Sequence, residues 1–459
     1  MSDDHCDCPP SAADLRLRRA AMEGCGESRL LMSRRAMLGV TAGLFSWAYM
    51  PRFAEGATND PRLLVVVLRG GMDGVNVCVP FGDKHYVSMR GDIAIPAAST
   101  IKLDTFFGLH PALVNFGKMY KANEAALVHA TCVPLRTRSH FDCQDNLENG
   151  MPAAIVPNPT GWLNRLMTAL PAGAPVKKAG AIEIGEAPLI LRGPAPVLGW
   201  SSTWFDKVED PLLYLIETLY RERDSEMYGA LERGLKADQI ASRSDQDDGS
   251  ISDLRKAFRG AGRLIAANDG PRIAVLSVGG WDTHADQGAA QGYLAGVLGE
   301  LDLAIADFKA AVGPSWQNTV MVAATEFGRT VHVNGDSGTD HGVGTVVLLA
   351  GGAVNGGKVF GDWPGLAPAQ LYEQSDLKPT TDLRSVFKGI LRDHIGVATN
   401  LLNTSIFPSS GSTAPAMSGL LKASAAKSMT GSIASLRAEP PIARYRKGLP
   451  VVAGLGAGA

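Results

Sequence analysis

Acidic residues and histidines recur in this chain in short polar clusters, each placed next to an apolar run. The clusters are residues 70–76, 138–142, 279–284, 325–329 and 338–342. They contain four carboxylates and two histidines that could act as ligands: Asp73, Asp282, Glu326, Asp340, His284 and His341. Acids that gather at one place repel one another unless cations neutralise them, so we expect these side chains to hold divalent metal. Mixed carboxylate and imidazole donors suit Zn²⁺, Mn²⁺ or Fe²⁺ better than Ca²⁺, and six donors suffice for one or two ions.

Ser139 is the candidate nucleophile beside these ligands. It begins a predicted helix over residues 139–149, where the backbone N–H groups and the helix dipole favour an anion. A nearby metal lowers the pKa of a hydroxyl and so activates it. Arg138 or Arg329 could bind the oxyanion of a tetrahedral group through two parallel hydrogen bonds. The structural alternative, that Ser139 only caps the helix, fits its residue type equally well.

The elements that would position these residues are read from the apolar runs. Five runs rich in Val, Leu and Ala cover residues 63–68, 125–133, 273–278, 319–324 and 345–350. Continuous runs of this kind are typical of parallel strands that are buried on both faces. Amphipathic stretches that we read as covering helices occupy residues 211–236, 251–267 and 293–312, and a polar loop is predicted at 237–250. We therefore predict a doubly wound α/β fold with a mostly parallel sheet flanked by helices. Ligands of such sheets bind beyond the carboxyl ends of the strands, which would bring the polar clusters together.

Composition and charge exclude several other classes of protein. The chain has 459 residues, of which 45% are hydrophobic and 20% charged, so wholesale disorder is excluded. Its formal charge of −2 gives no basic field to attract nucleic acid. Residues 70–74 lack the spacing of a dinucleotide-binding loop, and Asp73 would stand where a pyrophosphate must approach.

The two ends of the chain are expected to lie outside the folded domain. Arg34 and Arg35 precede an apolar run at 39–50 that is too short for a transmembrane helix, a layout similar to a twin-arginine export signal. We expect residues 1–57 to be this signal region, 58–407 a single α/β domain, and 408–459 a low-complexity, disordered tail. The predicted location is periplasmic or secreted, after export of the folded protein, with no transmembrane anchor in the mature chain.

Taken in order, the motifs LRGGMDGVN, RSHFDCQD, GWLNR, GGWDTH, TEFGR, GTDHG and PTTDLRSVFKGIL resemble the bacterial family called domain of unknown function 1501. The resemblance covers roughly residues 61–407 and implies a fold related to the alkaline phosphatase and sulfatase superfamily. It implies that Asp73 and the pair Asp340–His341 bind one metal, that Asp282 and His284 bind a second, and that Ser139 is the nucleophile. Phosphatases of that superfamily usually have a further metal-binding histidine well after the Asp-His pair, whereas the only histidine after His341 is His394. Either Glu326 replaces that ligand or only one metal binds.

These patterns predict an exported metal-dependent hydrolase that acts on a phosphate or sulfate ester, either a small molecule or a polymer. One alternative is a non-catalytic metal-binding or assembly protein on the same fold. A second alternative starts from residues 132–136, which match the Cys-x-Pro-x-Arg core at which sulfatases convert cysteine to formylglycine, and makes a modified Cys132 the reactive group. No protein partner can be identified from the sequence.

Overall fold

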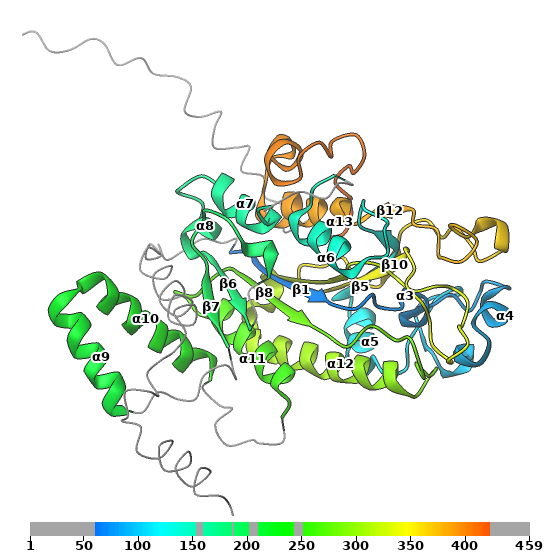
Figure 1. The fold of residues 1–459 in the computed structure, drawn as a ribbon, viewed down its shortest axis with the longest axis horizontal. Coiled ribbons are helices and arrows are strands. Elements are labelled where there is room, and N and C mark those ends of the chain that lie inside the picture. Colours follow the sequence, from blue (N-terminus) through cyan, green and yellow to red (C-terminus); the bar gives the residue numbers. More distant parts are fainter. Residues whose placement is uncertain (1–59, 153–158, 186–187, 202–209, 243–250, 423–459) are drawn as a thin grey trace, which may run out of the picture.

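A nine-stranded sheet forms the centre of the molecule in this computed structural model, which describes residues 60–152, 159–185, 188–201, 210–242 and 251–422 (Figure 1). Its strands are β1 (Arg62–Leu68), β5 (Ala125–Cys132), β6 (Ala181–Ile184), β7 (Leu198–Trp200), β8 (Ile273–Val278), β9 (Thr319–Thr325), β10 (Thr345–Ala350), β11 (Lys358–Phe360) and β12 (Thr381–Asp382). Their order is β11-β5-β10-β9-β1-β8-β6-β7, and β12 pairs with β5 beside β11. A small second sheet contains β2 (Cys78–Val79), β3 (Ile101–Lys102) and β4 (Gly108–Leu109). All five predicted apolar runs are strands of the large sheet.

Helices cover both faces of this sheet, as a doubly wound fold requires. One face packs against α5 (Val114–Lys121), α11 (Asp253–Ala266) and α12 (Tyr293–Val312), and the other against α6 (His140–Asn149), α7 (Trp162–Ala169) and α13 (Leu383–Ile390) (Figure 1). The shorter helices are α3 (Gly74–Val77), α4 (Tyr86–Arg90), α8 (Pro175–Ala179) and α14 (Thr399–Leu401). Alternate residues of β1 enter the two cores: Leu64 and Val66 pack on the first face, Leu63 and Val65 on the second. This alternation explains why the strand reads as a continuous apolar run. The predicted α/β fold class is confirmed.

Strand β10 runs against the direction of its neighbours. It pairs antiparallel with both β5 and β9, whereas β1, β8, β9, β6 and β7 pair in parallel. The amino end of β10 therefore lies at the edge where its neighbours have their carboxyl ends. The polar cluster at 338–342, which precedes β10, thus reaches the same edge as the clusters that follow β1, β5, β8 and β9.

The helix predicted at 211–236 is two helices in the structure. These are α9 (Asp210–Arg223) and α10 (Ser225–Ala241), and they form an arm beside the body of the molecule (Figure 1). The break comes at Asp224, whose carboxylate accepts a hydrogen bond from the Met227 N–H at 3.0 Å and so caps the start of α10. The predicted loop at 237–250 was wrong at its beginning, because α10 extends to Ala241.

Residues 408–422 pack against the domain, although we expected the disordered tail to begin at 408. Leu420 is buried in the core, and Leu421 forms a β-bridge with Val354. The fully buried ammonium of Lys388 on α13 donates to the Ser410 carbonyl at 3.2 Å, to the Ser410 hydroxyl at 3.0 Å and to the Ala414 carbonyl at 2.5 Å. The chain beyond 407 therefore satisfies a buried charge of the domain. The rest of the expected tail lies outside the described residues.

The expected signal region, residues 1–57, also lies outside the residues that the structure describes. Among the described helices, none combines the length and the apolar character that crossing a membrane requires.

Candidate metal centre

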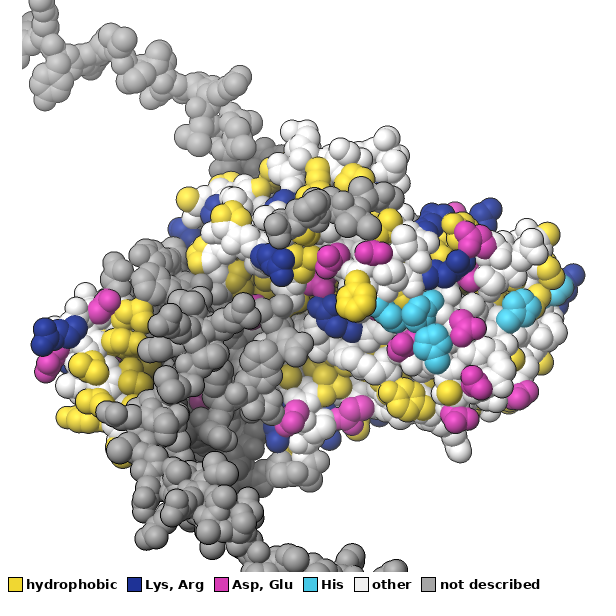
Figure 2. Space-filling view, in the orientation of Figure 1, with side chains coloured by type: hydrophobic (Ala, Val, Ile, Leu, Met, Phe, Trp, Pro, Cys, Tyr) yellow, Lys and Arg dark blue, Asp and Glu magenta, His cyan; other side chains and the backbone are white. Residues whose placement is uncertain are grey.

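Three imidazole rings and one carboxylate converge at the edge of the sheet. His341 Nε2 lies 3.0 Å from His140 Nε2 and 3.0 Å from His284 Nε2. The carboxylate of Asp282 completes the group, with oxygens 3.4 Å from His140 Nε2, 3.1 Å from His284 Nε2 and 3.3 Å from His341 Nε2. His140, Asp282 and His341 offer donor atoms that all lie within 4.8 Å of one another. The side chains of His140, His284 and His341 are 24%, 47% and 26% exposed, so the group is open to solvent on one side, and Figure 2 shows histidine side chains gathered at the surface.

The second nitrogen of each ring faces an oxygen acceptor. Nδ1 of His140 lies 2.8 Å from Glu326 Oε1, and Nδ1 of His341 lies 2.9 Å from the Arg138 carbonyl. Nδ1 of His284 lies 3.3 Å from Asp340 Oδ1. An oxygen that only accepts hydrogen bonds favours a proton on Nδ1, which leaves the Nε2 lone pair free. Three lone pairs are thus directed to one place.

This donor set fits a divalent transition metal. Two facing Nε2 lone pairs repel each other at 3.0 Å unless a proton or a cation lies between them. A tetrahedral ion with bonds of 2.0–2.1 Å places its ligand atoms about 3.3 Å apart, close to the distances in this cluster. Imidazole nitrogens with one carboxylate oxygen are the ligands of zinc and of related metals. The electrostatic surroundings agree, because burial and the neighbouring His140 and Arg329 lower the pKa of His341 and favour its neutral form.

Arg329 holds Asp282 in the cluster. Its fully buried guanidinium donates to Asp282 Oδ1 at 2.5 Å and also binds the hydroxyl and the carbonyl of Thr339. Burial alone would raise the pKa of Asp282, but Arg329 together with His284 and His140 outweighs burial and holds that pKa below its usual value. Asp282 is therefore ionised at neutral pH, as a metal ligand must be. Arg329, which we expected to bind an oxyanion, is already occupied by this carboxylate.

Glu326 and Asp340, two of the expected ligands, lie behind the imidazoles. Glu326 is fully buried, and its Oε1 accepts from the Gly70 N–H at 2.8 Å and from the Gln144 amide at 2.9 Å besides contacting His140. Asp340 contacts His284 and accepts from the Asn334 amide at 3.2 Å. Carboxylates in this position orient metal-binding histidines and increase their basicity. In the structure, each of these carboxylates thus contacts the Nδ1 atom of one imidazole of the cluster.

Asp73 is separate from the cluster. It is fully buried, its Oδ2 accepts from Arg90 and from the Gln287 amide, and its Oδ1 caps α3 through the Val75 N–H. No described contact joins its oxygens to the three histidines. The sequence could not reveal this, because nothing in residue spacing identifies Arg90 as the partner of Asp73.

Ser139 and Arg138 lie in the segment that leads to the first histidine. Ser139 is the N-cap of α6, where its Oγ accepts from the Asp142 N–H at 3.4 Å, so the predicted helix start is confirmed. Arg138 has a positive φ of 57°, and its carbonyl receives His341 Nδ1. Its guanidinium is paired with Glu373 and Asp376, each at 2.7 Å. The side chain that we expected to bind an oxyanion is thus engaged by two acids.

His140 is the cluster member that the sequence analysis did not select. It stands directly after Ser139 and is the first residue of α6, in the polar cluster that follows β5. Its position beyond the carboxyl end of a buried strand is the same signal that selected His284 and could have identified His140.

Cys132 is set apart from this group. It is a free thiol with 4% of its surface exposed, and burial raises its pKa to about 11, against the smaller opposite effect of Arg136. In this form it is a neutral, buried side chain rather than a reactive thiolate.

Comparison with known proteins places the chain in a family. Among solved structures, similar ones are Ps i-CgsB in complex with k-i-k-neocarrahexaose (12% identity, covering 78% of this chain and 77% of the other, TM-score 0.38) and the lipoteichoic acid synthase LtaP from Listeria monocytogenes (9%, 79% and 80%, 0.32). Another is a protein in the alkaline phosphatase superfamily from Vibrio parahaemolyticus (10%, 70% and 69%, 0.29). No curated protein matches the sequence. The family described as "Protein of unknown function (DUF1501)" matches residues 130–404, more than half of the chain. The chain therefore belongs to the DUF1501 family, as its motifs indicated.

Proposed function

We propose that this protein is an exported metal-dependent hydrolase that acts on phosphate or sulfate esters. The observation that supports the proposal is the convergence of the Nε2 atoms of His140, His284 and His341 on the Asp282 carboxylate. Zinc, manganese or iron fits these donors, and the compact cluster favours one ion over two. When bound there, such an ion supplies positive charge that polarises an ester oxygen.

The residues around the centre have different roles in the proposed reaction. Arg329 keeps Asp282 ionised and fixed, and Glu326 and Asp340 keep two of the imidazoles in the tautomer that binds metal. Ser139 is the proposed nucleophile, because it is adjacent in the chain to His140 and sits at the amino end of α6, where the dipole favours an approaching anion. The exposed side of the cluster, where 47% of the His284 side chain and 43% of Asp282 are accessible, leaves room for an ester.

The proposal is tested on protein produced without a chelator. Metal analysis should find about one transition metal per chain, and His341→Ala should lose it. The wild-type protein should hydrolyse aryl phosphates or aryl sulfates, and both His341→Ala and Ser139→Ala should abolish turnover, with Ser139→Ala retaining the metal. Unchanged turnover in Ser139→Ala would remove this residue from the mechanism, and metal-free wild-type protein would refute the centre itself.

Export is part of the proposal and has its own test. Replacing Arg34 and Arg35 by lysine should leave folded protein in the cytoplasm if the twin arginine is read as an address. Normal export of the double variant would contradict this assignment.

A non-catalytic metal-binding or assembly protein is the second candidate. It is favoured by the state of Arg138 and Arg329, since both guanidinium groups are paired with carboxylates and neither is free for an oxyanion. Protein that is folded and fully loaded with metal but turns over no ester in a broad panel would favour this function.

A further inference from the structure

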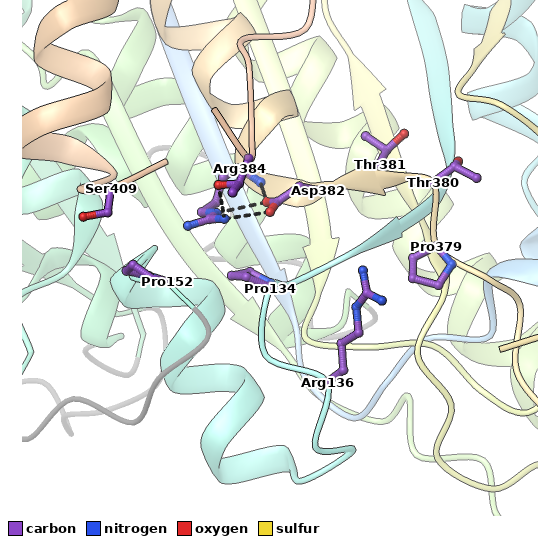
Figure 3. A pocket seen from close by; sticks show the side chains of 10 residues that line it. Pro134, Arg136, Pro152, Pro379, Thr380, Thr381, Asp382, Arg384 and Ser409 are labelled. Carbon is purple, nitrogen blue, oxygen red and sulfur yellow. Dashed lines mark hydrogen bonds and ion pairs between the residues drawn. The ribbon is translucent and has the colours of Figure 1, made fainter. Parts of the chain in front are cut away.

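A cavity of about 400 Å³ is lined by Pro134 and Arg136, in the segment between β5 and Ser139. It is open to solvent on one side and is lined by residues that follow β5, by β12 and the start of α13, and by the chain near Thr413 (Figure 3). Its volume is within the range of pockets that bind small molecules. Nothing in the proposed reaction uses it.

The charges around this cavity are unequal. Arg384 and Asp382 neutralise each other through two hydrogen bonds of 3.0 and 2.8 Å. Arg136 projects its guanidinium toward the space between Pro134 and Pro379 (Figure 3), and no ion pair joins it to a carboxylate of the described residues. One positive charge of the cavity is therefore left without a counterion.

Arg138, two residues further along the same segment, differs from Arg136 in its ion pairs. The guanidinium groups of both arginines lie over the ring of Tyr372, at 5.4 Å for Arg136 and 6.0 Å for Arg138. Arg138 is bound by Glu373 and Asp376, but Arg136 meets no such acid. The contact with the ring and a side-chain hydrogen bond with Cys132 hold the Arg136 guanidinium, and its other N–H donors are available to an anion.

We infer that this cavity binds an oxyanion group, a carboxylate, sulfate or phosphate, through Arg136. Planar guanidinium groups pair with such anions in a bidentate manner, and hydroxyl groups of Thr381, Ser409 and Thr413 line the rest of the space. Arg136 precedes His140 by four residues, so their Cα atoms are at most about 14 Å apart. Resting on the proposed function, the inference adds that the substrate carries a second acidic group beside the ester.

The first test reads the occupancy of Arg136 directly and needs no activity. Modification of arginine by phenylglyoxal is followed by peptide mass spectrometry with sulfate, phosphate or acetate added, against chloride at equal ionic strength. At least one of the three anions should slow modification of Arg136 severalfold and saturably, and the anion that does so identifies the preferred group. Arg192, an exposed arginine outside the cavity, should react at an unchanged rate. Equal protection of both arginines, or of neither, would overturn the inference.

Two variants separate the cavity from the metal centre. Thr413→Phe, which fills the cavity from an exposed position, should abolish the protection of Arg136. His341→Ala should retain the protection even if the proposed hydrolase activity does not exist. If the enzyme is active, Arg136→Gln should raise KM severalfold for esters with a second acidic group, with kcat unchanged, and leave simple aryl esters unaffected. An equal effect on both kinds of ester would refute the link to the substrate.

Discussion

Replacing Glu326 by glutamine tests whether a buried carboxylate controls the proposed metal centre through His140. Glutamine has the same shape, and its carbonyl can still accept from Gly70, Gln144 and His140, while the Thr325 hydroxyl, 2.9 Å from Oε2, rotates to accept from the new amide. The change therefore removes one negative charge 2.8 Å from His140 Nδ1 and little else. Losing such a support typically weakens metal binding 10–100-fold, which corresponds to about 1.4–2.7 kcal/mol.

The assay is a competition titration of metal-free protein with Zn²⁺ and a chromophoric chelator at pH 7. Asp302→Asn is the matched control, because Asp302 is also a buried carboxylate that accepts three hydrogen bonds, but from Asn115 and Phe116 on α5. We expect the control to bind zinc as the wild type does. An affinity within threefold of wild type for Glu326→Gln, or an equal loss in both variants, would refute the reasoning.

Three further predictions concern residues around the site and in the core. Burial lowers the pKa of His129 and of His394 to about 4, below the usual value of 6.5. Each histidine therefore binds fewer protons in the folded than in the unfolded protein, and the free energy of unfolding decreases as pH falls from 6.5 toward 4. At pH 5 each histidine lowers the free energy of unfolding by about 2 kcal/mol. Urea unfolding at pH 7 and pH 5 should show a larger decrease of this free energy for wild type than for His394→Gln, and equal decreases would contradict the prediction. Asp73→Asn should leave zinc affinity within threefold of wild type but lower the free energy of unfolding by about 3–5 kcal/mol, because the fully buried Arg90 loses its carboxylate; a hundredfold loss of affinity would restore Asp73 as a ligand. Intact-peptide mass spectrometry should find an unmodified thiol at Cys132, and loss of sulfur with gain of oxygen there would revive the formylglycine alternative.

The sequence was most informative where one local cause decides the structure. β8 and β10 begin and end at the residues predicted, because strands buried on both faces are uninterrupted apolar runs. Strands β6 and β7 were missed, since segments of four and three residues with a glutamate or a glycine inside carry no such signal. The antiparallel direction of β10 depends on tertiary packing and cannot be read from its residues.

The candidate site followed the same pattern. Placement at strand ends selected Asp282, His284 and His341, which the structure brings together. It could not distinguish side chains that meet at the Nε2 atoms from those that contact the Nδ1 atoms of the same rings, because Glu326 and Asp340 occupy the same kind of strand-end position. Asp73 and Arg138 show the other limit, because their partners, Arg90 and Asp376, stand at no recognisable spacing from them in the sequence.

The residues after Phe407 supply the hydrogen-bond acceptors of Lys388, the buried lysine on α13. Its three acceptors all come from Ser410 and Ala414, so a protease that clipped the chain at 407 would leave an ammonium stranded in the interior with nothing to solvate it. Removal of residues 408–422 should therefore destabilise the domain. The part of the chain that packs against α13 and its surroundings extends at least to 422, fifteen residues beyond the boundary expected at 407.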